Sequence, residues 1–264
     1  MTPVLRIDWE LLWDPARWGG VFSLVALIMG FNVLGLGLHG SQANQWNVLF
    51  SLVNNPFVAM ILLPMLFLIL ILDLAWRDMQ TWQASIWVRI PNRLSWWIAK
   101  MIILAGAALA YVAGIFSLGI LIGVLVAPFQ NGWSRLTFRP GSFTQTLAGH
   151  GLSPEMALLW SGVLLWGALV GFGLIGMSLS LWGRGIAGAG AMMAASTFAA
   201  YGLWVVHPSW GIWFPSFQGV LSAHAGFDPR LPRYFRVVWS LQWDGLWVLV
   251  SAITGAWRMA TALL

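Results

Sequence analysis

The residues able to do chemistry are few in this chain, and their spacing forms no catalytic or metal-binding cluster. Cysteine is absent, which excludes thiolate nucleophiles, thiolate metal ligands and disulfides. Converging imidazoles can bind a metal ion, but no two histidines have helical spacing and no acidic cluster accompanies them. No serine is paired with a base. We therefore predict no catalytic residue and no metal site, and we expect hydrogen bonding from His39, His150, His207 and His224.

Three polar side chains stand inside or beside long apolar runs. Asp244 lies near the start of the last such run, and a carboxylate at membrane depth often belongs to a pathway. Alternatively, it lies at headgroup level, paired with Arg236. Asn54 and Asn55 precede Pro56, and they either line a pathway or form the turn by which the chain enters a helix. Both alternatives stay open for each residue.

The composition indicates that most of the chain is surrounded by lipid. Of 264 residues, 59% are hydrophobic and 8% are charged, with a mean hydropathy of +0.80. A soluble domain carries about 25% charged residues because its surface has to be hydrated. A spanning helix needs about 20 mostly apolar residues. We predict an all-α polytopic membrane protein, a single domain over 1–264, with six spans at about 18–38, 53–74, 97–126, 156–182, 186–206 and 241–263.

Basic residues predict the orientation of these spans, because arginine and lysine are enriched on the cytoplasmic side. With the N-terminus inside, the inner side holds Arg6, Arg17, Arg77, Arg89, Arg93, Lys100, Arg184 and Arg258. The outer side holds fewer, namely Arg135, Arg139, Arg230, Arg233 and Arg236. We therefore expect both termini in the cytoplasm and all four histidines on the outer side.

Two segments outside the spans have a distinctive pattern. Residues 5–18 place Leu5, Trp9, Leu12 and Trp13 on one helical face and Arg6, Glu10, Asp14 and Arg17 on the other. This pattern is typical of an amphipathic helix lying in the membrane interface. Residues 207–240 are rich in proline, tryptophan and glycine, too apolar for a solvated loop and too broken for a span. We predict a re-entrant or surface-lying hairpin there, between the fifth and sixth spans.

The inner loop of residues 73–100 combines acidic, proline and basic residues. Its marked positions are Asp78, Thr81, Trp82, Arg89, Pro91, Arg93 and Lys100. Proline disfavours helix at the residue before it, so the chain must bend at Ile90. Arg93 and Lys100 then lie two turns apart on one helical face, from which they reach phosphates or a docked protein. As alternatives, the basic residues only set the topology, and Asp78 is a helix cap or a partner of Arg77.

This layout resembles the permease subunits of ABC-2 type ATP-binding-cassette exporters. In that family an acidic residue after the second span is followed by a threonine, a proline before an arginine, and a lysine at the start of the third span. The matching positions here are Asp78, Thr81, Pro91, Arg93 and Lys100, whereas Gln80 replaces the usual glycine and an aspartate replaces the commoner glutamate. The interfacial helix, six spans and outer hairpin also resemble that family.

The resemblance implies a function for the whole chain. Residues 73–91 would contain the coupling helix that presses on a separate ATPase subunit, with Arg184 near the same partner. The chain would export its substrate by alternating access, together with a second permease subunit of the same or a related sequence. ATP and Mg²⁺ would be bound by the ATPase, because this chain contains no phosphate-binding loop. It would itself be no enzyme, would hold no cofactor, and would lie in the bacterial cytoplasmic membrane.

The residues leave other functions open. A secondary transporter or channel would need no ATPase, although such folds usually show paired broken helices and internal repeats, which the sequence does not reveal. A membrane-embedded enzyme and a structural subunit are further alternatives. The small-residue run at 185–191 indicates close helix packing or a subunit interface. Lipid surrounds the chain, nucleic acid is no expected partner, and tryptophan on the outer half favours an amphipathic substrate such as a lipid, a peptide or a hydrophobic drug.

Overall fold

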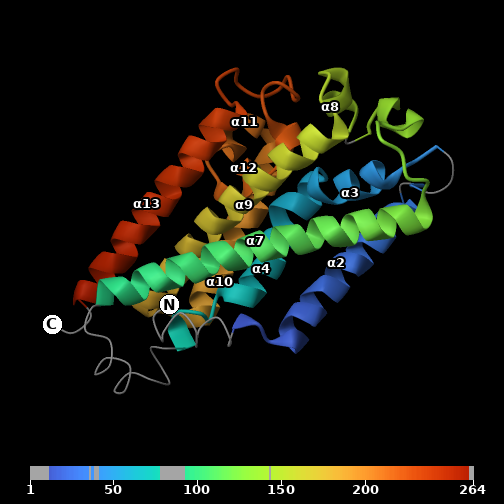
Figure 1. The fold of residues 1–264 in the computed structure, drawn as a ribbon. Helices are drawn as coiled ribbons and strands as arrows, with labels where there is room; N and C mark the ends of the chain where they lie inside the picture. The colour runs from blue at the N-terminus through green and yellow to red at the C-terminus, as the bar shows by residue number, and fades with distance from the viewer. Residues whose placement is uncertain (1–11, 36, 39–41, 78–92, 143, 262–264) are drawn as a thin grey trace.

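The computed structural model describes residues 12–35, 37–38, 42–77, 93–142 and 144–261, and in these ranges the chain is helical without strands. Five helices are long and apolar enough to cross a membrane. They are α2 (Pro15–Gly35), α7 (Arg93–Val126), α9 (Pro154–Leu179), α10 (Gly185–Val206) and α13 (Val237–Thr261) (Figure 1). The prediction of an all-α polytopic membrane protein is therefore confirmed.

The second apolar stretch along the chain, between α2 and α7, is a broken helix, which the sequence did not predict. It consists of α3 (Gln45–Val53), the π-helix η1 (Val58–Leu62) and α4 (Leu63–Ile71), with a bend of 57° between the two halves. Pro56 explains the break, because proline disfavours helix at the residue before it. The predicted span at 53–74 is therefore wrong at its start, and residues 45–53 belong to the buried bundle rather than to a loop.

The π-helix lies where α4 carries a proline. Pro64 has no N–H for the carbonyl four residues before it, and the wider turn of η1 ends just before that position. The hydroxyl of Tyr111 on α7 donates a hydrogen bond of 3.1 Å to the carbonyl of Leu63. The irregular backbone is thus tied to a neighbouring span, as backbone at membrane depth requires.

The remaining spans follow the predictions closely. Between the fourth and fifth spans, a second π-helix, η3 (Ser180–Arg184), leads directly into α10. Gly185 has a φ of +62°, a conformation that only glycine adopts without strain. At the N-terminus, α2 begins at Pro15, so the span starts earlier than predicted, and most of the proposed interfacial helix at 5–18 lies outside the described residues.

The hairpin predicted at 207–240 contains α11 (Pro208–Gly211), α12 (Pro215–Gln218) and the short 3-10 helix η4 (Leu221–Ala223). Its middle is buried: Phe217, Val220 and Leu221 have at most 1% of their surface exposed. The hairpin packs on α9, η1 and α13, so it re-enters the bundle. The loop after α7 forms η2 (Arg135–Phe138) and α8 (Gln145–Gly149) at the same end (Figure 1).

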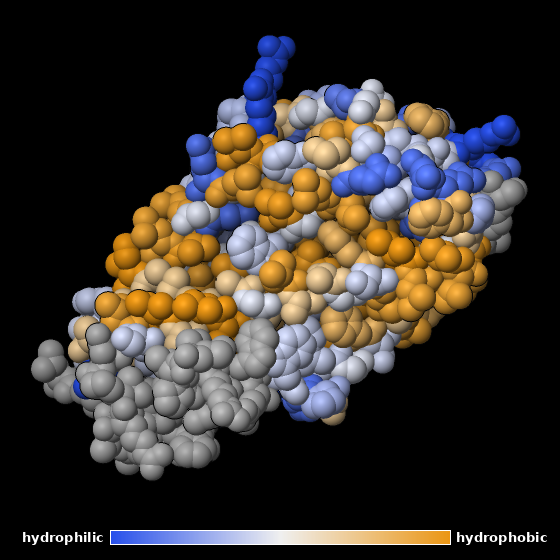
Figure 2. Space-filling view, viewed as in Figure 1, coloured by the Kyte–Doolittle hydropathy of each residue, from blue (hydrophilic) through white to orange (hydrophobic). Residues whose placement is uncertain are grey.

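The surface has the polarity of a protein surrounded by lipid. Large apolar side chains are freely exposed, including Leu34 (74%) and Leu125 (75%), while polar groups such as Gln45 and Lys100 are fully buried. Figure 2 shows hydrophobic side chains in a broad band across the visible face, with hydrophilic ones gathered along its upper edge. In a protein surrounded by water, polar groups such as these would be exposed.

Candidate functional site

The end of the bundle predicted to face the cytoplasm is held by an ion pair between two spans. Arg17, in the first turn of α2, donates two hydrogen bonds of 2.8 and 2.9 Å to the carboxylate of Asp73, just after α4. It also donates to the carbonyl of Leu70 at 3.2 Å. Both charged side chains are less than one-third exposed, and bidentate geometry of this kind is among the stronger charge pairings. The end of α4 is therefore fixed to the start of α2.

A second set of bonds fixes the start of α7 to the end of α13. Arg93 donates to the carbonyl of Met259 at 3.0 Å, and cations favour such helix C-termini because their carbonyls lack helical partners. Arg258 donates to the carbonyl of Leu181 at 3.1 Å, which connects α13 to η3. The loop between α4 and α7 is consequently attached at both ends to other spans.

Most of the predicted coupling residues lie outside the described residues, namely Asp78, Thr81, Trp82, Arg89 and Pro91, together with the side chain of Arg184. Arg93 and Lys100 are described. Lys100 is fully buried, with its ammonium 5.3 Å from the centre of the Trp96 ring. The expectation that Lys100 reaches outward to a docked partner is therefore wrong, and a cation–π contact is part of what holds this side chain inside.

Asp244 faces inward at a close helix crossing. It is 3% exposed, and neither carboxyl oxygen has a hydrogen-bond partner among the described residues. The predicted pairing with Arg236 is therefore wrong. A Cβ added to Gly167 of α9 would lie 3.1 Å from Oδ2, so glycine at that position makes the room that the carboxyl occupies.

The buried face of α13 is polar or small over most of its length. Its buried residues are Ser240, Asp244, Ser251, Gly255 and Met259, whereas large apolar side chains lie on the exposed face, among them Leu249 and Ile253. Ser178 of α9 donates to the carbonyl of Ser251 at 3.2 Å. A span with its polar face inward is typical of helices that line a pathway.

Asn54 and Asn55 occupy the break between α3 and η1. Asn55 accepts a hydrogen bond of 3.1 Å from the backbone N–H of Phe57, which is the helix-entry role considered above. Asn54 is fully buried, and neither amide atom has a partner among the described residues. One of the two asparagines thus shapes the turn, while the other presents an unused amide inside the bundle.

The polar residues before the break form a pocket that sequence reasoning missed. Asn44 caps α3, and Asn47 lies within that helix, nearly fully buried. Asn47 donates to the hydroxyl of Thr137 at 2.9 Å. The signal was present in the spacing of Asn44, Asn47, Ser51 and Asn54, which lie on one helical face.

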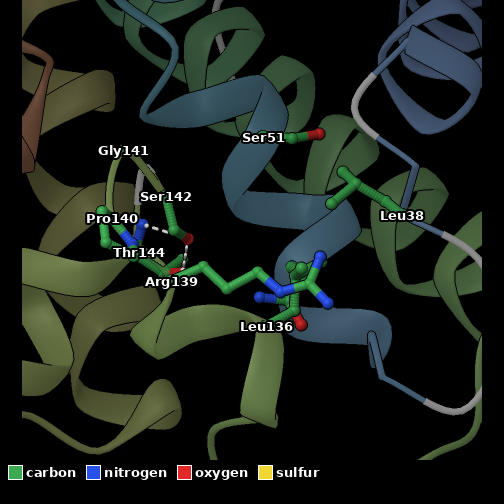
Figure 3. Close-up of a pocket in the computed structure, with 9 residues that line it drawn as sticks. Leu38, Ser51, Leu136, Arg139, Pro140, Gly141, Ser142 and Thr144 are labelled. Atoms are coloured by element: carbon green, nitrogen blue, oxygen red, sulfur yellow. Dashed lines mark hydrogen bonds between the residues drawn. The ribbon is translucent and has the colours of Figure 1, made fainter.

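This pocket lies at the predicted outer end and has a volume of about 200 Å³. Asn47 and Ser51 of α3 form one wall, and Arg139, Ser142 and Thr144 form the other. Figure 3 shows Arg139 crossing the pocket near Leu136, with the hydroxyls of Ser142 and Thr144 in contact at 2.8 Å. One side of the cavity therefore offers a guanidinium and hydroxyl groups, which suit a polar or anionic group.

His224 is the centre of a hydrogen-bond network between the hairpin and α13. Its Nε2 lies 2.8 Å from the hydroxyl of Ser240, which donates to the Gln218 side chain at 2.7 Å. Its Nδ1 lies 3.0 and 3.1 Å from the carbonyls of Val220 and Leu221. His150 likewise bonds the carbonyl of Thr146 at 2.7 Å, so hydrogen bonding by these two histidines is confirmed. No metal-binding group of His, Asp or Glu occurs among the described residues.

The network predicts a stability that depends on pH. Burial lowers the pKa of His224 to about 4 from 6.5, against the raising effect of the two carbonyls. Between these values the unfolded chain binds more protons, so stability falls as the pH decreases from 6.5 towards 4. We expect a loss of about 3 kcal/mol from this residue, measured as a fall in unfolding temperature. His224→Gln should flatten that part of the pH profile, and an unchanged slope in the variant would contradict the assignment.

No protein-family model, no curated protein and no solved structure matches this chain. The function is therefore inferred from the contacts of the residues described above and from the resemblance of the inner loop to that of ABC-2 type permeases.

Proposed function

We propose that the chain is the membrane-spanning permease subunit of an ABC exporter, driven by a separate ATPase subunit. The observation that carries the proposal is the attachment of the inner loop at both of its ends. Arg17 bonds to Asp73 before the loop, and Arg93 bonds to Met259 after it. A force on the loop would thus act on α2 and α13 as well as on α4 and α7.

The rest of the bundle suits alternating access. Tilting of α13 against α9 would open the polar face that carries Asp244, and the break at Asn54 allows α3 and α4 to tilt separately. The outer pocket beside Arg139 then lies where a substrate would leave. A substrate would thus meet polar groups along its path through the bundle, while the outer surface of the bundle would stay apolar and face lipid.

A second permease subunit would pack on α10. That helix buries Ala189, Met193, Thr197 and Ala200 within the chain, which is the close packing expected from its small residues. Its opposite face exposes further small residues at helical spacing, namely Ala187, Ala191, Ala195 and Ala199. Small residues allow helices to approach closely in membranes, so this face fits a same or related chain, whereas ATP and Mg²⁺ would remain with the ATPase.

Purification of the tagged protein from its native membranes tests the proposal. We expect an ATP-binding subunit to co-purify with the wild type and to be lost from Asp78→Ala/Arg93→Ala, because the loop would no longer contact it. Arg233→Ala at the outer end is the matched control and should retain the partner. Size-exclusion profiles confirm that each variant is folded. Wild type without an ATPase, under conditions that preserve a known ABC complex, would refute the proposal.

The broken helix favours a second candidate, a secondary transporter that needs no ATPase. Discontinuous helices near the centre of the bilayer bind substrates and ions in such proteins. The segment α3–η1–α4 is likewise discontinuous, with the unused amide of Asn54 at its break. Uptake into proteoliposomes driven by an ion gradient, with the purified chain alone, would favour this candidate. Uptake only with the ATPase and ATP would exclude it.

A further inference from the structure

The pocket between α3 and the loop after α7 holds a positive charge that its own walls do not neutralise. The two segments that line it, 38–51 and 134–144, contain two arginines and no acidic residue. Of the two, Arg139 lines the pocket (Figure 3). Its guanidinium donates to the side-chain oxygen of Gln42, a neutral group, and makes no other hydrogen bond among the described residues. A guanidinium carries five N–H groups, so most of them are available to a ligand.

Hydroxyl groups add a second kind of donor on the same side of the pocket. The oxygens of Ser142 and Thr144 lie 2.8 Å apart, and either can be the donor of that bond. Only one of the two hydroxyl protons lies between them, so the other hydroxyl keeps its O–H for a ligand. Thr144 is only 2% exposed and lines the cavity. A donor within the protein is therefore placed in the same cavity as the guanidinium.

The opposite wall is already satisfied and holds its shape. The side-chain oxygen of Asn47 accepts hydrogen bonds from Ser134 and from the backbone N–H of Asn44. Ser51 donates to the carbonyl of Val48 at 2.7 Å. Across the pocket mouth, the two lining segments are joined where the N–H of Leu136 donates to the carbonyl of Gln42 at 3.2 Å. A site whose walls are fixed in advance loses little entropy when it binds.

The size and surroundings of the pocket indicate the class of ligand. Its volume of about 200 Å³ far exceeds the ~30 Å³ that one water molecule takes in the liquid. A guanidinium fork matches the oxygens of a phosphate, and phosphate is the anion of lipid headgroups at a membrane surface. Leu38 and Leu136 give the pocket apolar edges, and α2 exposes Phe31 and Leu34 shortly before Leu38. The chemistry fits a phosphate group attached to an apolar tail.

We propose that this pocket binds the phosphate of a phospholipid from the adjacent leaflet. Arg139 supplies the charge, and the free hydroxyl of the Ser142–Thr144 pair supplies a further donor. The acyl chains stay outside the pocket, against the apolar surface of the bundle. The inference goes beyond the proposed function, because it assigns a ligand to the pocket whether or not an ATPase drives the chain.

Native mass spectrometry of the purified chain in detergent, titrated with dioleoylphosphatidylglycerol, tests the site. We expect Arg139→Gln to weaken binding of one lipid about tenfold or more, because hydrogen bonds between charged groups are among the strongest. Arg139→Lys should recover part of the affinity, since an ammonium keeps the charge but lacks the fork. Arg135→Gln is the matched control: it removes the same charge from the same loop at an exposed position that does not line the pocket, and it should bind like the wild type.

Two further titrations identify the part of the lipid that is recognised. Dioleoylglycerol has the same acyl chains without the phosphate, and its binding should not differ between wild type and Arg139→Gln. Inorganic phosphate should displace the phospholipid only at far higher concentration. Equal weakening in Arg139→Gln and Arg135→Gln would indicate general charge attraction and overturn the proposal. Displacement by inorganic phosphate at equal concentration would assign the pocket to the free ion and overturn the lipid as its ligand.

The titration needs no ATPase, so its result is separate from that of the co-purification. Both arginines are exposed, so each variant should keep the unfolding temperature of the wild type, and this measurement excludes misfolding as the cause of lost binding. Arg139-dependent lipid binding without a co-purified ATPase would keep the site and refute the exporter. An ATPase that co-purifies with a chain whose lipid binding ignores Arg139 would do the opposite.

Discussion

Gly123→Ala is expected to destabilise the contact between α3 and α7 by about 1–3 kcal/mol, the usual range for an overpacked core. The added Cβ would lie 2.7 Å from the Cα and 3.0 Å from the carbonyl oxygen of Gln45. These are backbone atoms at the start of α3, and Asn44 fixes that backbone through a capping box. Gln45 also exchanges two hydrogen bonds with Gln130. The helix cannot move aside without breaking them.

The measurement is the unfolding temperature in detergent, followed by tryptophan fluorescence. Gly245→Ala on α13 is the matched control, because its Cβ would meet nothing within 4 Å. In a helix that control should be neutral or stabilising, since alanine is the better helix former. Gly114→Ala is a second comparison: the atoms nearest its Cβ would belong to the Phe22 ring, which is a side chain rather than a capped helix backbone. Equal unfolding temperatures for all three variants would show that α3 is not held as described.

Arg17→Ala is expected to lower stability by about 1–3 kcal/mol and, under the proposed function, to reduce transport. The reason is that Asp73 would keep a charge that is only 22% exposed without its cation. This estimate lies between the small worth of exposed ion pairs and the 3–5 kcal/mol of fully buried ones. Loss of the pair would also free α2 from α4, so that movement of the inner loop would no longer reach α2.

A double-mutant cycle separates the pair from other contacts of each residue. Arg17→Ala, Asp73→Ala and the double variant should give a coupling energy of about 1–2 kcal/mol, because the double variant leaves no unpaired charge. Arg17→Lys should recover part of the stability, since an ammonium cannot form the bidentate contact. Additive single effects would show that the two residues act independently, and the attachment of α2 to the loop would then be untenable.

The sequence alone determined the class of the protein, the number of apolar stretches and most span boundaries. These properties are local, because each stretch is defined by about 20 consecutive residues and by the thickness of the bilayer. The hairpin at 207–240 was also predictable, because proline fixes φ and removes a backbone donor wherever it occurs, and glycine admits conformations that other residues avoid.

The tertiary structure decided which polar residues are buried and what they contact. Asn44, Gln45 and Asn47 had the composition of a loop, but they are buried because the distant segment 130–137 supplies partners for their amides. The partner of Arg17 was equally beyond sequence reasoning, as was the burial of Lys100 beside Trp96.

Asp244 shows the same division most clearly. The sequence predicted a carboxyl in an apolar run, but the space that the buried carboxyl occupies depends on Gly167, on a helix far away in the chain. The length of an apolar run follows from neighbouring residues, whereas the satisfaction of a polar group depends on residues that only folding brings together. For that reason the sequence determined the membrane architecture, and only the tertiary structure decided the candidate sites.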